Sequence, residues 1–147
     1  MNLTRGTHLG PYEVIEAIGA GGMGEVYRAR DPRIERDVAI KILPAIFSSS
    51  PDRLARFERE AKTTGSLNHP NLLVVFDLGT HEGSPYLVTE YLEGETLRQR
   101  LERGAVPIRT AVAWATQIAE GWRRRMRKGS FIGTSNRRTC FFRAMSG

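Results

Sequence analysis

The feature that most constrains the fold is a glycine-rich turn, which reads Gly19-Ala20-Gly21-Gly22-Met23-Gly24. Apolar and polar residues alternate before it over residues 12–18, and the alternation resumes after it over residues 25–30. Alternation with a period of two is typical of half-buried strands, so the turn predicts a hairpin. Glycines without a Cβ atom leave backbone N–H groups open to a polyphosphate.

Two other glycine motifs are excluded by what surrounds this turn. In a dinucleotide-binding fold the last glycine opens a helix, whereas here a strand follows Gly24. A phosphate loop of the Walker type requires a Gly-Lys-Ser/Thr step, and the turn contains none. The pattern therefore favours a flexible flap between two antiparallel strands.

Residues 37–43 are rich in β-branched residues and predict a third strand, with Lys41 near its end. A lone lysine is usually a surface residue. Here the preceding Val38, Ala39 and Ile40 favour a buried strand instead. A cation held at that position can bridge phosphate oxygens if a carboxylate fixes it.

The next segment predicts a helix from Ser50-Pro51-Asp52 to Gly65, with apolar residues at helical spacing. Glu60 is the candidate carboxylate for Lys41 because it lies one turn after Phe57, beside the apolar stripe. Glu58 is the competitor, and a solvated surface glutamate is the alternative interpretation of either residue.

Two further strands are expected at residues 72–77 and 86–91, joined by a turn at residues 79–84. A short helix over residues 96–102 and a longer one from about Pro107 to Gly121 follow, the longer with one apolar face that needs a partner. The expected fold class is α+β, with a five-stranded antiparallel sheet, one packing helix and two further helices.

Five motifs occur in a fixed order along residues 9–121. They are Gly19 to Gly24, Val38-Ala39-Ile40-Lys41, Phe57-Glu58-Arg59-Glu60-Ala61, Leu67-Asn68-His69-Pro70-Asn71 and Val88-Thr89-Glu90-Tyr91. Together they make the chain resemble a bacterial serine/threonine protein kinase of the eukaryotic-like type. The resemblance implies a kinase N-lobe followed by the first helices of a truncated C-lobe.

The resemblance also implies an ATP site, with Mg²⁺ accompanying ATP in the intact family. Lys41 would pair the α- and β-phosphates with Glu60, Thr89 would be the gatekeeper, and residues 90–92 would be the hinge that meets adenine. The residues so implied are Ile18, Gly19, Ala20, Gly21, Gly22, Met23, Gly24, Glu25, Val26, Ala39, Lys41, Glu60, Thr89, Glu90, Tyr91 and Leu92.

The other half of a kinase site is missing from the sequence. A His-Arg-Asp loop, a Lys-Pro-Glu-Asn segment and an Asp-Phe-Gly motif would supply the base and the metal ligands, and none occurs in these 147 residues. We therefore assign no catalytic residue and no metal ligand, and expect an inactive chain. The alternative is a non-catalytic module that binds nucleotide or docks on a kinase.

The charge of the chain changes abruptly after Gly121. Residues 1–121 hold 14 basic and 16 acidic residues, whereas residues 122–147 hold 8 basic and no acidic ones, which accounts for the net charge of +6. A basic patch suggests nucleic acid or an anionic membrane. Residues 122–147 nevertheless lack a nucleic-acid motif and any period, and we predict a disordered tail that binds no specific nucleic acid.

The genetic code offers an origin for that tail. Codons that encode residues 122–140 can, when read one base out of register, encode Leu-Ala-Ala-Ala-His-Glu-Lys-Gly-Ile-Val-His-Arg-Asp-Leu-Lys-Pro-Glu-Asn-Leu, which looks like a helix end and a kinase catalytic loop. We infer that one nucleotide is lost near the codon of Gly121. Alanine codons read out of frame then explain the arginines.

The expected domain organisation is an N-terminal extension (1–10), a kinase N-lobe (11–93), the start of a C-lobe (94–121) and the off-frame tail (122–147). The single cysteine, Cys140, cannot form a disulfide within one chain. No run approaches the ~20 apolar residues of a membrane span, and we expect a cytoplasmic location. Protein substrates are expected only for the intact parent.

Overall fold

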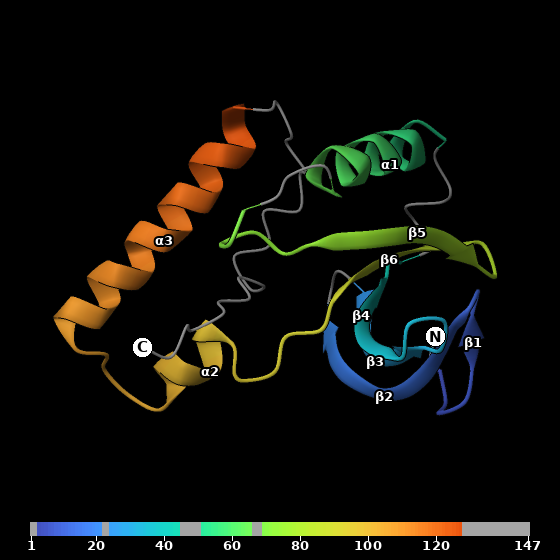
Figure 1. Cartoon of the computed structure of the whole chain (residues 1–147), viewed down its shortest axis with the longest axis horizontal. Helices are drawn as coiled ribbons and strands as arrows, with labels where there is room; N and C mark the ends of the chain where they lie inside the picture. Colours follow the sequence, from blue (N-terminus) through green and yellow to red (C-terminus); the bar gives the residue numbers. More distant parts are fainter. Residues whose placement is uncertain (1–2, 22–23, 45–50, 66–68, 128–147) are drawn as a thin grey trace.

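The computed structural model describes residues 3–21, 24–44, 51–65 and 69–127 (Figure 1). Within the helix at residues 51–65, several side chains, including those of Phe57 and Glu60, also lie outside the described set. The elements in chain order are β1 (His8–Leu9), β2 (Tyr12–Gly21), β3 (Gly24–Asp31), β4 (Arg36–Ile42), α1 (Pro51–Gly65), β5 (Val75–His81), β6 (Ser84–Glu90), α2 (Leu97–Glu102) and α3 (Ile108–Arg127).

The strands form one curled antiparallel sheet in the order β1-β2-β3-β4-β6-β5 (Figure 1). The five expected strands and the intervening helix are confirmed as β2 to β6 and α1. A sixth strand, β1, was missed, because residues 1–10 were interpreted as an extension. Its two residues are too few to show a period, but Leu9 pairs with Tyr12 and is completely buried.

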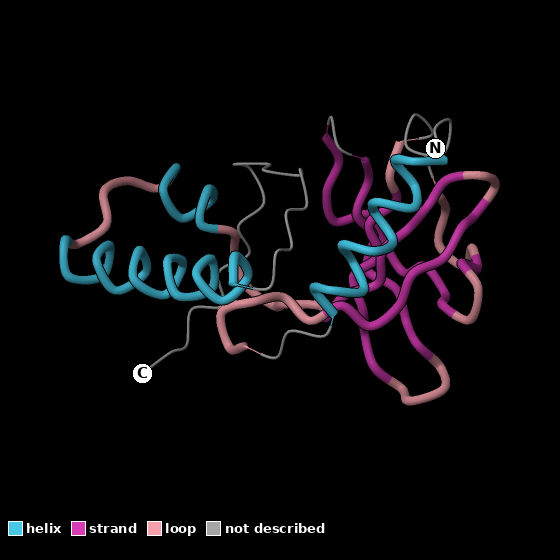
Figure 2. Tube along the Cα trace, turned by 90° about the horizontal axis from the view of Figure 1, so that it is seen from above, coloured by secondary structure: helices cyan, strands magenta, loops and turns pink. Residues whose placement is uncertain are grey.

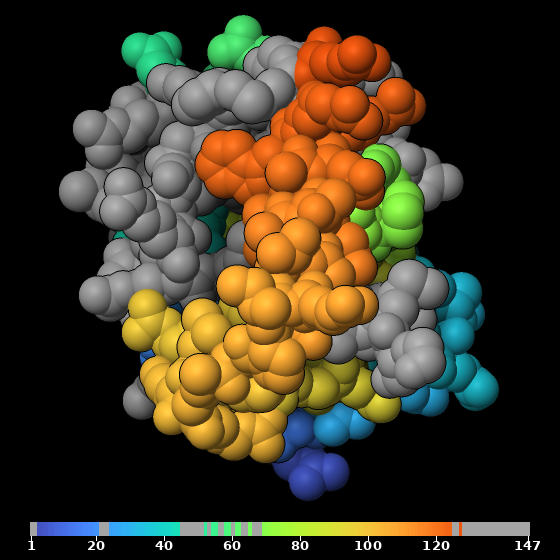
Figure 3. All heavy atoms as spheres, turned by 90° about the vertical axis from the view of Figure 1, so that its left-hand side faces the viewer, coloured from blue at the N-terminus to red at the C-terminus, as the bar shows by residue number. Residues whose placement is uncertain are grey.

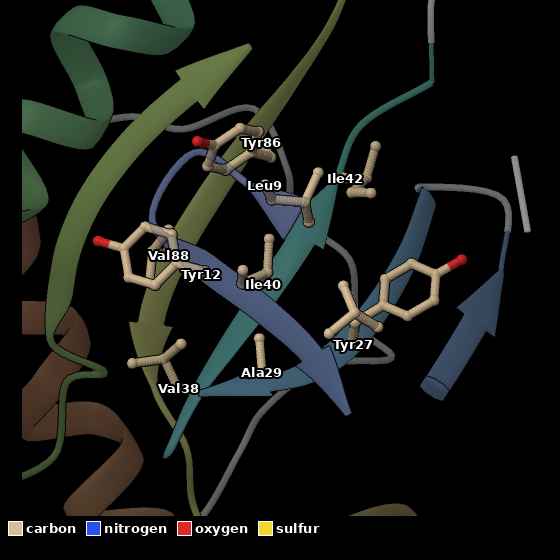
Figure 4. Close-up of a cluster of buried hydrophobic side chains, with 10 residues drawn as sticks. Leu9, Tyr12, Tyr27, Ala29, Val38, Ile40, Ile42, Tyr86 and Val88 are labelled. Atoms are coloured by element: carbon tan, nitrogen blue, oxygen red, sulfur yellow. The ribbon is translucent and has the colours of Figure 1, made fainter. Parts of the chain in front are cut away.

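The hydrophobic core lies on one face of the sheet (Figure 4). Alternate residues of β3, β4 and β6 point into it, as a two-residue period requires. The buried cluster comprises Leu9, Tyr12, Val14, Tyr27, Ala29, Val38, Ile40, Ile42, Tyr86 and Val88. The residues between them, such as Ala39 and Lys41 on β4, therefore lie on the opposite face.

A hydrogen bond across the sheet reinforces its curl. The Tyr12 hydroxyl on β2 donates to Oδ2 of Asp77 on β5, at 2.8 Å, although these strands are not neighbours in the sheet order. Arg33 Nη2 donates to the same hydroxyl oxygen at 3.1 Å. Burial, followed by the hydrogen bond to Asp77, raises the pKa of Tyr12 to about 12.

The β5–β6 hairpin differs from the expectation in position. Its turn is Glu82-Gly83 rather than residues 79–84, and both residues have positive φ, 48° and 77°. This is the two-residue turn that matches strand twist. Gly79 lies inside β5 and not in the turn. Glycine is needed there because the Tyr86 ring occupies the space that a Cβ atom would fill.

Helix α1 has the predicted end at Gly65 and begins at Pro51. The expected cap Ser50 lies outside the described residues. The helix lies along β5 (Figure 1), and Ala61 is its fully buried side chain among those described. Packing against the sheet, rather than propensity alone, therefore holds α1 in place.

Helices α2 and α3 lie together to one side of the strands (Figure 2). Thr96 caps α2: its Oγ1 accepts from the Gln99 amide at 3.2 Å, and Gln99 Oε1 accepts from the Thr96 amide at 2.8 Å. This reciprocal pair satisfies two donors at the helix start. The short helix expected at residues 96–102 is thus confirmed.

Helix α3 runs to Arg127, beyond the expected end at Gly121. The prediction of disorder from Trp122 onward is therefore wrong for residues 122–127, while residues 128–147 lie outside the described set. Arginine and methionine are good helix formers, and positive charge suits a helix C-terminus. Helix propensity extends α3 although the apolar period stops.

The apolar face of α3 stays exposed over the described residues, as the sequence led us to expect. Ile108 is 79% and Val112 59% exposed, and α3 runs across one face of the molecule (Figure 3). The helix is attached through Asn71, whose Nδ2 donates to the Gln117 carbonyl at 3.0 Å. Gly121 is buried against Asn71.

Among the described helices, none is long and apolar enough to span a membrane.

Candidate nucleotide-binding site

The glycine-rich turn is a hairpin between β2 and β3, as predicted. Gly19 pairs with Val26, Ala20 with Glu25 and Gly21 with Gly24. Gly22 and Met23, which complete the turn, lie outside the described residues. Because β3 continues directly from Gly24, no helix N-terminus is available here, and any backbone contact with phosphate at this turn would come from the hairpin.

Gly24 anchors the hairpin to the strand that carries Lys41. Its φ is +107°, and a Cβ atom would overlap the carbonyl oxygen of Ile42 and lie 3.0 Å from the carbonyl carbon. Only glycine combines that conformation with so close an approach. Gly24, the first residue of β3, is therefore held against the end of β4.

The strand register gathers several predicted site residues on one face. Lys41 lies opposite Val26 on β3 and opposite Leu87 on β6, while Ala39 lies opposite Thr89. Residues two apart on a strand share a face. Val26, Ala39, Lys41 and Thr89 therefore share the face that the core does not use, below the glycine hairpin.

Lys41 is half-buried in this face. Burial disfavours its charged form and lowers its pKa. It forms no ion pair with any carboxylate whose side chain is described. The Glu60 side chain lies outside that set, so the Lys41–Glu60 pair stays a prediction, while the competitor Glu58 is described and exposed.

Thr89 lies on this face near the C-terminal end of β6 and is 5% exposed. Its hydroxyl lies 3.2 Å from the carbonyl oxygen of Glu90 and 3.4 Å from that of Ala39. The hydroxyl is therefore satisfied within the protein. Its assignment as gatekeeper stays a prediction, and its burial at the inner end of β6 suits that role.

Residues 90–92 leave the end of β6 toward α2. The Glu90 amide donates to the Val74 carbonyl at 3.0 Å, and Glu90 Oε1 accepts from the Val74 amide at 3.0 Å. Tyr91 and Leu92 follow and are half-buried. This double contact with Val74 was not predicted, since no local pattern links residues sixteen positions apart.

A charged cluster on the same face also escaped sequence analysis. Arg28 donates from Nε and Nη2 to Asp37 Oδ2 at 2.8 and 2.5 Å, and from Nη1 to Glu16 Oε1 at 3.1 Å. Arg30 Nη1 donates to Asp37 Oδ1 at 3.0 Å. These arginines, Arg28 foremost, lower the pKa of Asp37. The sequence hinted at this cluster only through basic residues on β3 and acidic residues on the neighbouring strands β2 and β4.

Of the remaining predicted residues, Ile18 and Glu25 flank the glycine-rich turn, and Glu25 shares the core face of β3 with Tyr27. Ile18 is 41% exposed, just before the hairpin. Glu25 accepts a hydrogen bond of 2.5 Å from the Tyr27 hydroxyl, so its carboxylate is engaged with the sheet. Within the described residues, no group of three His, Cys, Asp or Glu side chains could hold a metal ion.

Comparison with known proteins gives one consistent result. The protein kinase domain family matches residues 12–124. The chain is 38% identical over 110 residues to the probable serine/threonine-protein kinase CPE1738 of Clostridium perfringens, covering 74% of this chain and 16% of the relative. It is 46% identical over 101 residues to the serine/threonine-protein kinase PknB of Mycobacterium tuberculosis, covering 65% and 16%.

Solved structures agree on the fold. A mutant of the Mycobacterium tuberculosis PknI kinase domain superimposes with a TM-score of 0.81 at 27% identity, covering 88% of this chain and 53% of that one. The chain thus spans about a sixth of the length of the curated relatives and about half of the solved domain.

Proposed function

Because the chain belongs to the protein kinase domain family, we propose that it is the ATP-binding portion of a bacterial serine/threonine kinase. The observation that carries this proposal is the shared face of Val26, Ala39, Lys41 and Thr89 beneath the glycine hairpin. Three neighbouring strands thereby place apolar side chains and a cation on one face beside the glycine-rich turn, and a nucleotide requires such groups.

Each part of the nucleotide has a matching part of the site. The hairpin backbone from Gly19 to Gly24 would lie over the phosphates, and the Lys41 ammonium would neutralise the α- and β-phosphate oxygens. Val26 and Ala39 would contact the adenine ring, whose edge would meet the backbone of residues 90–92. The pKa of Lys41, lowered by burial, would rise again on binding because the anion favours the charged form.

We further propose that this polypeptide transfers no phosphoryl group. Transfer needs a base for the substrate hydroxyl and ligands for Mg²⁺, which the absent His-Arg-Asp and Asp-Phe-Gly motifs would supply. Mg²⁺ in phosphoryl-transfer sites is held by one or two carboxylates together with the phosphates, and among the described residues no cluster of three acidic, histidine or cysteine side chains could hold the ion alone. We therefore assign no step to the metal.

We propose that the loss of one nucleotide near the codon of Gly121 produced the basic residues 122–147 and removed the catalytic motifs. The family match ends at residue 124, close to that position, and codons can be chosen for residues 122–140 that encode a kinase catalytic loop when read one base out of register. Resequencing the gene tests the idea. A kinase C-lobe in the neighbouring frame is expected, and a confirmed frame without that C-lobe would contradict it.

The proposed activity is tested with the full 147-residue chain and its Lys41→Met variant. Calorimetric titration with ATP should show saturable binding that the variant loses, and radioactive ATP should label no generic protein substrate. Absence of binding by the wild type would refute the nucleotide site. Lys41-dependent labelling of a substrate would refute the inactivity. We also propose a cytoplasmic location and, for the intact parent, protein substrates.

A further inference from the structure

Arg28 occupies a central position beside the proposed adenine site. It lies two residues after Val26 on β3 and directly opposite Ala39 on β4, so it shares their face of the sheet. Two of its nitrogens donate to Asp37 Oδ2 and a third donates to Glu16 Oε1. One side chain therefore ties together β2, β3 and β4.

The same guanidinium also contacts the segment that follows β6. Its Cζ atom lies 5.0 Å from the centre of the Tyr91 ring, within the range of a cation–π interaction. Tyr91 has left the sheet, and the chain runs on toward α2 (Figure 1). Arg28 is thus a link between the sheet and residues 90–92.

We infer that Arg28 is a positioning residue, which holds Tyr91 against the sheet and so orders the backbone of residues 90–92 before adenine binds. This inference rests on the proposed function, because that function assigns the adenine contacts to these residues. Ordering the free protein in its binding geometry increases affinity by reducing the entropy lost on binding.

The chemistry of arginine suits this role. Asp37 and Glu16 fix the orientation of the planar guanidinium, which leaves its face available to an aromatic ring. A lysine at this position could pair with one carboxylate, but it could not donate through a fork and stack at once. Arg28→Lys should therefore retain the charge and lose most of the positioning.

Arg30 provides a matched control on the same strand and face. It also donates to Asp37, at 3.0 Å, and its side chain is 45% exposed against 32% for Arg28. Among the described residues, the Tyr91 ring makes its cation–π contact with Arg28 and not with Arg30. Arg30→Met therefore removes equal charge from the Asp37 cluster without touching the proposed link.

The first measurement compares two ligands by calorimetry on the full chain. Arg28→Met should weaken ATP binding about three- to tenfold, as loss of one such contact predicts, and should leave inorganic tripolyphosphate binding unchanged. Arg30→Met should change neither. Equal loss for both ligands, or equal loss in both variants, would show a general charge effect and overturn the inference. Thermal unfolding of each variant identifies any failure to fold.

The second measurement needs no nucleotide. Backbone ¹⁵N relaxation should show lower order parameters for Tyr91 and Leu92 in Arg28→Met and in Tyr91→Leu, with no further drop in the double variant. Arg30→Met should match the wild type. Unchanged order parameters would overturn the positioning role, even if ATP binds. If the wild type binds no ATP, the proposed function fails, and these order parameters still decide whether Arg28 orders the segment.

Discussion

Gly24 lies so close to Ile42 that a β-carbon on Gly24 would overlap the Ile42 carbonyl oxygen. This approach joins the first residue of β3 to the end of β4, one residue beyond Lys41. Gly24 and Lys41 thus lie close together, although seventeen positions separate them in the sequence.

Gly24→Ala should lower the free energy of unfolding by about 1–3 kcal/mol, because it adds both a clash and an unfavourable φ of +107°. Gly19→Ala is the control: its added Cβ would meet Val26 Cβ at 3.9 Å, an ordinary contact. Urea denaturation of both variants measures the difference. Similar effects at the two glycines would contradict the close approach.

Lys41→Met should weaken ATP binding tenfold or more, since it removes a charge-assisted contact to phosphate. It should not lower stability at pH 7. The folded pKa of Lys41 lies below its unfolded value, so the protonated side chain opposes folding, and this cost is lost as pH rises from the folded to the unfolded pKa. Any stability gain of the variant should accordingly shrink toward pH 10.

Exposed Lys62 on α1 provides the control for that charge. Lys62→Met should leave ATP affinity within about twofold of the wild type, because an exposed charge on α1 is screened from the site. Calorimetry and urea denaturation at pH 7 and pH 10 give both readouts. A destabilised Lys41→Met variant would argue that Lys41 is held by a structural ion pair.

Tyr12→Phe should cost about 1 kcal/mol at pH 7, because it removes the hydrogen bond to Asp77 that reinforces the curl. The folded pKa of Tyr12 is about 12, above its ordinary value of 10.0. The contribution of the protonated hydroxyl is therefore complete below pH 10 and lost as pH rises toward 12. Denaturation at pH 8, 10 and 11 should show the variant and the wild type converging.

Glu90→Ala should cost about 1–2 kcal/mol, because it leaves the Val74 amide without its side-chain acceptor. Glu90→Gln retains an acceptor oxygen and should recover most of that loss. Hydrogen exchange of the Val74 amide is the direct measurement, with faster exchange in the alanine variant alone. Unchanged exchange in Glu90→Ala would show that the Glu90 carboxylate does not protect the Val74 amide.

The sequence predicted those parts of the fold that depend on neighbours along the chain. The alternation in β2, β3 and β4, the glycine hairpin and the helix at α1 all follow from periods and turn residues. The end of α3 was misjudged because residues 122–127 lost their apolar period but kept a high helix propensity. Periodicity reports burial, and a helix can continue without it.

The contacts between distant residues could not be predicted in this way. The strand β1 is too short to carry a pattern, and its place depends on the burial of Leu9 by the rest of the sheet. The Arg28 contact with Tyr91 depends on the strand order β3-β4-β6, which brings β3 within reach of the segment that follows β6. The residues next to Arg28 and next to Tyr91 in the sequence contain no pattern that would predict this contact.

By itself, the sequence determined the strand alternation, the need for glycine at the hairpin and the identity of Lys41 as a candidate phosphate contact, because these follow from local backbone chemistry. Only the tertiary structure decided that Val26, Ala39, Lys41 and Thr89 share one face opposite the core. The physical reason is that register between strands is set by packing the whole core at once, and a shift of one residue would turn Lys41 inward.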